Sequence, residues 1–116
     1  MYKQGDIVAV HYPLTDKPAK TKLRPALIVS GELSNNIDKD VLVCPLSTKI
    51  RQSDFSYALS NTELSFPLPE NSEIRCNKIM TIRVWDKQII GKLSEVNAAS
   101  MEKILAVVKK VFEKSP

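Results

Sequence analysis

The apolar residues of this chain follow two different periods, and the change between them constrains the fold more than any other feature. Before residue 94, short apolar runs alternate with polar and proline-containing stretches, as expected for strands and their connections. From Ser94 onward, apolar residues recur at spacings of three and four, which is typical of a helix with one buried face. The chain is therefore predicted to be mainly β, as a small barrel or curled sheet, with one C-terminal amphipathic helix.

Five to seven short strands are predicted before this helix. They cover residues 5–12, 25–30, 40–48 and 54–60, with one or two more within 73–85. Polar segments join them: a basic, proline-rich loop of about ten residues after the first strand, a turn region at 31–40 and a proline-bearing loop at 66–72. The helix is predicted to begin at Ser94 and Glu95 and to run for roughly five turns.

The length and composition favour one globular domain. A chain of 116 residues is close to the commonest domain size. No apolar run approaches the roughly 20 residues of a membrane span, and Gly5 and Asp6 stand where a signal peptide needs apolar residues. We therefore expect a single domain over residues 1–116 that stays in the cytoplasm without a membrane partner. Cys44 lies in an apolar run and is expected to be a buried, reduced thiol.

Most familiar catalytic arrangements are absent from the sequence. His11 is the only histidine, which excludes a two-histidine ribonuclease mechanism and a histidine-rich metal site. The chain has no P-loop, GxGxxG, HExxH or GxSxG motif. Asp38 and Asp40 come closest to clustered carboxylates, but such a pair in a polar turn is more often solvated than metal-bound. We expect no metal and no cofactor, and His11 is either a structural residue or an acid–base participant.

Polar side chains stand at the ends of two predicted strands. Arg24 ends the basic segment, and Ser47 and Thr48 end the strand at 40–48. A strand holds such a side chain in place while it still reaches solvent, which suits charge stabilisation. An ordinary salt bridge for Arg24 and an ordinary strand end remain open alternatives. The net charge of +4, with its surplus concentrated in the basic segment, permits a polyanionic partner.

Short motifs extend over nearly the whole chain. They are GDIV (5–8), YPLTD (12–16), KLRPALIVS (22–30), VCPLSTKI (43–50), KIMTI (78–82) and IGKLS (90–94). In this order and spacing they resemble the motifs of the MazF/PemK toxins of type II toxin–antitoxin systems. Each motif is weak alone, but together they agree with the strands and the helix predicted above.

The resemblance implies an SH3-like β-barrel with a C-terminal helix that forms a two-fold homodimer. It also implies sequence-specific, metal-independent cleavage of single-stranded RNA. In this reaction the 2′-hydroxyl attacks the adjacent phosphate and leaves a 2′,3′-cyclic phosphate and a 5′-hydroxyl end. A cognate antitoxin is the expected protein partner. The alternative is a non-catalytic binding module of the same fold, either a degenerate toxin or a relative that poisons a protein such as gyrase.

The resemblance assigns the candidate catalytic residues. Arg24 matches the family's catalytic arginine, whose planar guanidinium suits phosphate oxygens. The family's catalytic threonine aligns with Ser47, and the adjacent Thr48 stands where the family often has serine. Both positions carry a hydroxyl, so which of the two acts stays open.

The resemblance also implies an RNA-binding surface. The residues expected to contact RNA are Lys17, Lys20, Lys22, Lys49, Arg51 and Lys78. For the loop lysines, solvation without RNA contact is the alternative. Tyr12 and Trp85 are candidates for stacking a base, with a core or dimer role as the alternative. The chain departs from the family at Met80, where several members carry arginine or phenylalanine, so its base preference is left open.

Overall fold

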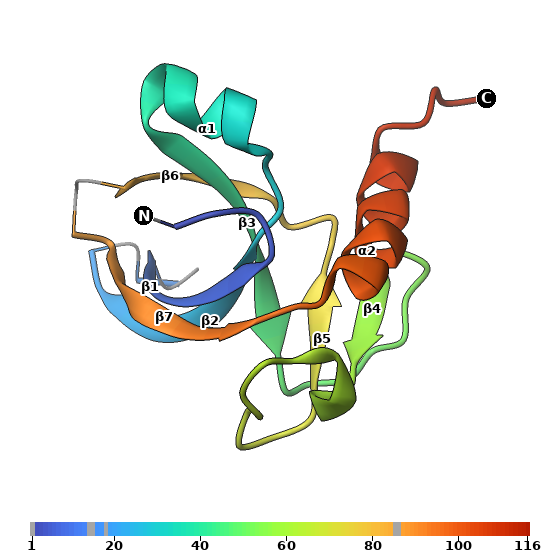
Figure 1. Ribbon diagram of the computed structural model, residues 1–116, viewed down its shortest axis with the longest axis horizontal. Coiled ribbons are helices and arrows are strands. Elements are labelled where there is room, and N and C mark those ends of the chain that lie inside the picture. The colour runs from blue at the N-terminus through green and yellow to red at the C-terminus, as the bar shows by residue number, and fades with distance from the viewer. Residues whose placement is uncertain (1, 14–15, 18, 85–86) are drawn as a thin grey trace.

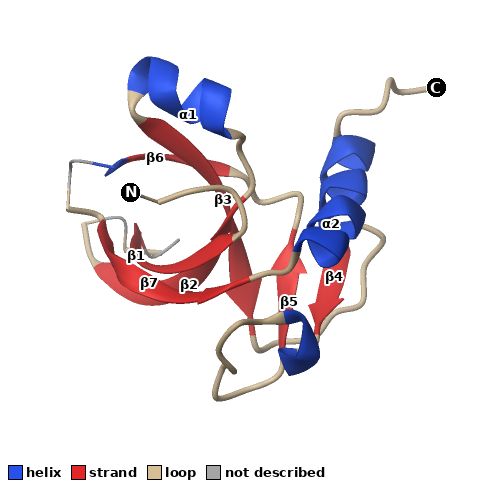
Figure 2. Cartoon of the chain, in the orientation of Figure 1, coloured by secondary structure: helices blue, strands red, loops and turns tan. Residues whose placement is uncertain are grey.

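The computed structural model describes residues 2–13, 16–17, 19–84 and 87–116. Within these residues the elements follow the order β1 (Asp6–Pro13), β2 (Thr21–Ile28), α1 (Glu32–Asp38), β3 (Asp40–Ser47), β4 (Ser56–Leu59), η1 (Asn61–Glu63), β5 (Ser72–Arg75), β6 (Met80–Arg83), β7 (Ile89–Glu95) and α2 (Ala98–Val111). The strands form one curled sheet, and α2 lies beside β4 (Figure 1). Strands dominate the molecule, and the longer helix is the C-terminal one (Figure 2). The prediction of a mainly β fold with a C-terminal helix is confirmed.

Strand β3 is the centre of the sheet. The strands follow the order β4-β5-β3-β2-β1-β7, and β6 pairs with β3 in addition. Along one edge of β3, its first half pairs with β6 and its last two residues pair with β5. Strand β2 pairs with β3 along the opposite edge. In the described part of the chain no ladder joins β6 to β7, so the sheet is barrel-like without being closed.

Alternate residues of the inner strands enter two separate cores. On β1, Ile7 belongs to the core under α2 and its neighbour Val8 to the core inside the curl. On β3, Cys44 likewise belongs to the core under α2 and its neighbour Val43 to the core inside the curl. Because both faces of these strands are buried, their sequences are nearly continuous apolar runs.

The prediction that Cys44 is buried is confirmed. Cys44 and Cys76 are both free, fully buried thiols in the core under α2. Burial raises the pKa of Cys44 to about 12, with the nearby Cys76 adding to the effect, and burial raises the pKa of Cys76 to about 11. Both thiols are therefore neutral and unreactive at physiological pH.

Helix α2 covers the first core. Its buried face carries Met101 and Ile104. The Asn97 side chain accepts a hydrogen bond from the backbone N–H of Ser100 at 2.8 Å and caps the helix. The helix has 14 residues, which is about four turns and not five. No helix among the described residues is long and apolar enough to cross a membrane.

Two predictions about the helices are wrong. The C-terminal helix does not begin at Ser94, which belongs to β7 and is bonded through its hydroxyl to the backbone N–H and carbonyl of Phe66. The segment at 31–40 is not a turn region, because it contains α1. The buried Asn35 holds α1 in place through its side chain, which donates to the carbonyl of Ser30 at 3.1 Å.

Strand β2 begins earlier than predicted. The prediction placed its start at Pro25 and left the residues before it in a loop. Pairing with β1 continues as far as Thr21, which lies opposite Pro13. Lys22 and Arg24 therefore lie on an extended, hydrogen-bonded strand, which fixes their backbones more firmly than a loop would.

Candidate functional site

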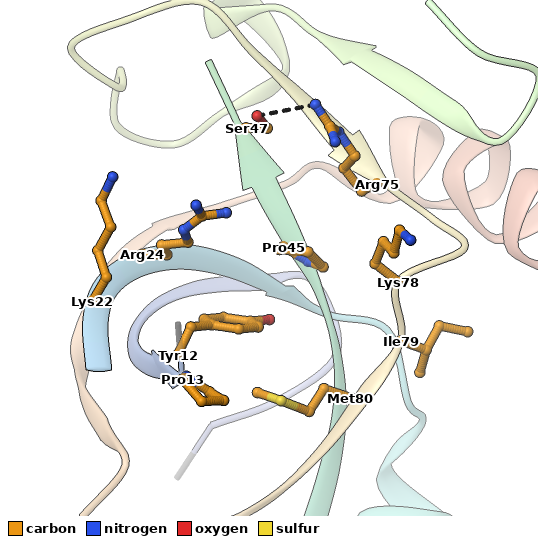
Figure 3. Close-up of a pocket in the computed structure, with 10 residues that line it drawn as sticks. All are labelled: Tyr12, Pro13, Lys22, Arg24, Pro45, Ser47, Arg75, Lys78, Ile79 and Met80. Carbon is orange, nitrogen blue, oxygen red and sulfur yellow. Dashed lines mark hydrogen bonds between the residues drawn. The ribbon is translucent and has the colours of Figure 1, made fainter. Parts of the chain in front are cut away.

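A pocket of about 510 Å³ lies where the ends of β1, β2, β3 and β5 approach the β5–β6 connection. Its lining residues, shown in Figure 3, are Tyr12, Pro13, Lys22, Arg24, Pro45, Ser47, Arg75, Lys78, Ile79 and Met80. Among the described residues the lining comprises four basic side chains, Ser47 and five apolar or aromatic side chains, and no carboxylate. The pocket thus combines a cationic side with an apolar side.

The registers of the sheet bring these residues together. On the β1–β2 ladder, Tyr12 lies opposite Lys22, and Arg24 follows two residues further along the same strand. Side chains two residues apart point to the same face of a strand, so these two cations share one side. On the β3–β6 ladder, Val43 lies opposite Met80, which places the β5–β6 connection beside β3.

The cationic side of the pocket carries uncompensated charge. Among the described residues, Lys22, Arg24 and Lys78 form no ion pair, whereas Arg75 pairs with Glu73. The ordinary salt bridge considered for Arg24 is therefore not formed within the described chain. Several unpaired cations around one hollow attract an anion, and guanidinium groups in particular match the oxygens of a phosphate.

Arg75 and Ser47 form the most ordered part of the site. Arg75 Nη2 donates to Ser47 Oγ at 3.2 Å and to the carbonyl of Lys49 at 2.8 Å (Figure 3). The backbone N–H of Lys49 also donates to Ser47 Oγ, at 3.2 Å. A hydroxyl oxygen has two lone pairs and one proton. With both lone pairs occupied by N–H donors, the Ser47 proton is left to donate to a group in the pocket.

Glu73 lies behind the pocket on β5 and is 1% exposed. Its Oε1 accepts hydrogen bonds from the backbone N–H groups of Arg51 and Gln52, at 2.9 and 3.1 Å. Its Oε2 pairs with Arg75 Nε at 3.1 Å. Burial by itself raises the pKa of a carboxyl, but these N–H donors and the Arg75 charge together hold the pKa of Glu73 below its usual value. Glu73 is therefore an ionised, fully partnered carboxylate.

Tyr12 forms part of the apolar side. Figure 3 shows its ring lying near Pro13, with the hydroxyl directed toward β3, between Pro45 and Met80. Among the described residues this buried hydroxyl has no hydrogen-bond partner. Burial raises the pKa of the Tyr12 phenol well above its usual range, although the Arg24 charge opposes the shift. Tyr12 is neutral at physiological pH and presents mostly apolar surface to the pocket.

The structure brings together only part of the predicted site. Arg24, Ser47, Lys22, Lys78 and Tyr12 line the pocket. Other predicted residues do not line it, namely Thr48, Lys17, Lys20, Lys49 and Arg51. Thr48 lies beyond the end of β3 in an exposed bend, so the geometry favours Ser47 as the hydroxyl of the site. Trp85 lies outside the described residues.

Arg75 is the site residue that sequence reasoning missed. It follows Glu73 and Ile74 in a predicted strand, where alternate charged residues look like an ordinary exposed edge. The spacing of Glu73 and Arg75 does place both side chains on one face of the strand. The pairing of β5 with the last two residues of β3 was not visible in the sequence, and this pairing brings Arg75 to Ser47.

His11 lies outside the main pocket. It lines a shallow depression with Pro13, Thr21, Lys87 and Gln88, and its backbone exchanges hydrogen bonds with Gln88. These hydrogen bonds involve only the backbone of His11, in the second half of β1. Within the described residues no cluster of three or more histidine, cysteine, aspartate or glutamate side chains is placed to hold a metal ion.

The fold and the pocket together define a small, curled β-sheet protein whose cationic site is suited to a phosphate group. The model of the family described as PemK-like, MazF-like toxins of type II toxin–antitoxin systems matches residues 3–112. The chain therefore belongs to this toxin family, as the motifs of the sequence predict.

Solved structures share this fold at low sequence identity. A mycobacterial endoribonuclease in complex with its cognate antitoxin is 22% identical, with a TM-score of 0.78 over 100% of both chains. A MazE–MazF complex from Deinococcus radiodurans is 15% identical, with a TM-score of 0.76 over 98% of both chains. The Mycobacterium tuberculosis toxin MazF-mt6 is 19% identical, with a TM-score of 0.72 over 96% of this chain and 99% of that one. No curated protein sequence matches the chain.

Proposed function

We propose that this toxin is an endoribonuclease that cleaves single-stranded RNA in a sequence-specific way without a metal ion. The 2′-hydroxyl of the substrate attacks the adjacent phosphorus, the bond to the 5′ oxygen breaks, and the products carry a 2′,3′-cyclic phosphate and a 5′-hydroxyl. The observation that carries the proposal is the convergence of Arg24, Ser47 and Arg75 on one pocket, with no carboxylate among the described residues of its lining. The family and the fold agree with it.

In this proposal the two arginines stabilise the charge that develops on the phosphate. As the 2′ oxygen attacks, negative charge grows on the non-bridging oxygens, and donors already fixed in the pocket stabilise it without reorganising. Arg24 and Arg75 approach from β2 and β5, on opposite sides of β3 (Figure 3). A guanidinium keeps its proton at any physiological pH, so neither arginine acts as the base.

Ser47 donates a hydrogen bond to the same phosphate. Its oxygen already accepts from Arg75 and from the backbone of Lys49, which leaves the hydroxyl proton for the substrate. This arrangement favours Ser47 over Thr48 as the residue equivalent to the family's catalytic threonine. Because the substrate supplies the nucleophile, the protein needs no catalytic cysteine and no serine–histidine pair.

The apolar side of the pocket receives a base next to the scissile phosphate. Tyr12, Pro45 and Met80 form a surface on which a base packs, and stacking of a base on such a surface contributes about 1–3 kcal/mol in other proteins. The lysines and arginine outside the pocket then contact the RNA backbone on either side; they are Lys17, Lys20, Lys49 and Arg51. These contacts predict binding that weakens as salt rises.

We also propose that the toxin acts as a homodimer and is held inactive by a cognate antitoxin. The mycobacterial endoribonuclease described above is in complex with its cognate antitoxin, and the Deinococcus structure is a MazE–MazF complex. The C-terminal part of α2 supports a protein contact on this chain, because Phe112 is 72% exposed and Val108 is only partly buried. An antitoxin that covers the pocket would exclude RNA from it.

The test is cleavage of a long, mixed-sequence single-stranded RNA in EDTA by the antitoxin-free toxin. Discrete cuts with cyclic-phosphate ends are expected from the wild type. Arg24→Ala should lower the cleavage rate by about 100-fold or more, because it removes a donor to the developing charge. Lys103→Ala, a charge change on the exposed side of α2 away from Phe112, should leave the rate unchanged.

Two results would contradict the proposal, the first its activity and the second its site. One is a folded wild-type dimer that cuts no RNA, which leaves a non-catalytic binding module as the better account. The other is cleavage by Arg24→Ala at the wild-type rate, which removes the pocket from the chemistry.

A further inference from the structure

We propose that Glu73 is a positioning residue for the cleavage site: it holds Arg75 in place and, through Arg75, directs the hydroxyl proton of Ser47 into the pocket. The inference rests on the proposed function. Glu73 does not line the pocket and is buried behind it, so it acts through a neighbour that does. That neighbour is Arg75, two residues along on the same face of β5.

The two oxygens of the Glu73 carboxylate have separate partners. Oε1 accepts the backbone N–H groups of Arg51 and Gln52 and so anchors the turn after β3. Oε2 faces Arg75 Nε alone, at 3.1 Å. The turn includes Gln52, which has a positive φ of 53° and benefits from a fixed anchor. One oxygen therefore has a structural task, and the other orients a residue of the pocket.

The bond to Nε restricts the guanidinium of Arg75. A free arginine side chain has many rotamers, and fixing it in one geometry costs conformational entropy. The Arg75 side chain is 16% exposed and is held at Nε by Glu73 and at Nη2 by Ser47 and Lys49. Its orientation is thus established before any substrate enters, which is the condition for efficient charge stabilisation.

Because Arg75 is fixed, the hydroxyl of Ser47 is fixed as well. Arg75 Nη2 is one of the two N–H donors to Ser47 Oγ, and the other is the backbone N–H of Lys49. If Arg75 moves away, one lone pair of the Ser47 oxygen is released and the hydroxyl can rotate. Its proton is then no longer directed toward the substrate phosphate for most of the time. Loss of the Glu73 charge therefore affects two donors of the site together.

Glu73→Gln is expected to keep the hydrogen bonds to the turn and to lose the one to Arg75. The amide oxygen of glutamine can still accept from Arg51 and Gln52, so the turn stays anchored. Its NH2 group then faces Arg75 Nε, and two donors cannot bond to each other. The variant is expected to fold while it releases Arg75.

The experiment measures kcat and KM for a short RNA that contains one mapped cleavage site, with folding of each variant checked by circular dichroism. Glu73→Gln should lower kcat by about 10- to 100-fold and change KM little, because the donors it misplaces act mainly in the transition state. In an Arg75→Ala background the same substitution should lower kcat no further. If Glu73→Gln lowers kcat only when Arg75 is present, Glu73 acts through Arg75. A purely structural role of Glu73 would lower kcat in both backgrounds.

Glu63→Gln is the matched control. Glu63 also accepts a backbone N–H, from Ser60 at 2.8 Å, and a side-chain donor, the Tyr57 hydroxyl at 2.6 Å, but its partner Tyr57, unlike Arg75, does not line the pocket. Its kcat should equal that of the wild type. A folded Glu73→Gln protein with wild-type kcat would overturn the inference, as would an equal loss of kcat in the Arg75→Ala background. A wild type that cleaves no RNA would instead contradict the proposed function itself, and with it this inference.

Discussion

Two tyrosine hydroxyls in this protein have opposite surroundings. The hydroxyl of Tyr57 donates to Glu63 Oε2 at 2.6 Å. The hydroxyl of Tyr12 is buried in the pocket wall and finds no partner among the described residues. A buried hydroxyl without a partner loses its bonds to water and gains nothing in return, whereas a typical internal hydrogen bond contributes about 1 kcal/mol.

This contrast predicts different effects of the same substitution. Tyr12→Phe should leave the free energy of unfolding unchanged or raise it by up to about 1 kcal/mol, because it removes an unpaired polar group. Tyr57→Phe should lower it by about 1–2 kcal/mol, because Glu63 loses a donor. Urea denaturation of both variants checks the pair. A loss of stability for Tyr12→Phe as large as for Tyr57→Phe would show that the Tyr12 hydroxyl has a partner in solution.

The sequence revealed those parts of the site that lie within short motifs of consecutive residues. Arg24 and Ser47 were recognisable because each lies within a motif at the end of a strand. Arg75 was not recognisable, because its partner Ser47 lies 28 residues away and meets it only through strand pairing. The role of Glu73 depends on a hydrogen bond to a backbone turn 21 and 22 residues away, which no local pattern encodes.

At the scale of elements, strand β7 was missed because two irregularities disturb its alternation. Its register against β1 shifts between Ile7 and Val8 and again between Ala9 and Val10. The residues skipped on β7 are Leu93 and Ile90. Such bulges turn the extra side chains outward, and both are exposed. The resulting pattern does not alternate as a regular strand does, so periodicity alone could not identify it.

The N-terminal end of helix α2 can be tested for the contribution of its capping residue, Asn97. Asn97 satisfies the N–H of Ser100, and removal of an N-cap side chain typically costs about 1 kcal/mol. Asn97→Ala should therefore lower the free energy of unfolding by about that amount in urea denaturation. Asn36→Ala, at an exposed position within α1, should cause little change because alanine favours a helix interior. Equal effects of the two substitutions would show that Asn97 does not act as the cap.

At the scale of the whole molecule, the distribution of charge matters more than its sum. The net charge of +4 is modest for a protein that binds a polyanion. The acidic groups Asp6 and Glu95 form ion pairs with Lys92 on one edge of the sheet, away from the pocket lining. In the part of the chain that the structure describes, the pocket lining has four basic residues and no acidic one. A small surplus of cations, gathered from both sides of the central strand β3, favours an anion such as a phosphate there.

The sheet topology explains why this concentration of charge is possible. β3 pairs with β2 along one edge and with both β5 and β6 along the other, so side chains from four strands surround its C-terminal end. Two cores on opposite faces of the inner strands keep this region rigid. Except for Lys78 and Ile79, which lie in the β5–β6 connection, the described residues that line the pocket lie on strands, which holds their side chains in place.

The central claim is that the substrate's own 2′-hydroxyl is the nucleophile in this pocket. The most direct measurement compares two oligonucleotides in EDTA: an RNA with one mapped cut, and the same RNA with a single 2′-deoxynucleotide on the 5′ side of that cut. The proposed mechanism predicts cleavage of the first, with a 2′,3′-cyclic phosphate and a 5′-hydroxyl identified by mass, and no product from the second. Cleavage of the deoxy-substituted strand at a comparable rate, or a 5′-phosphate on the product, would contradict it.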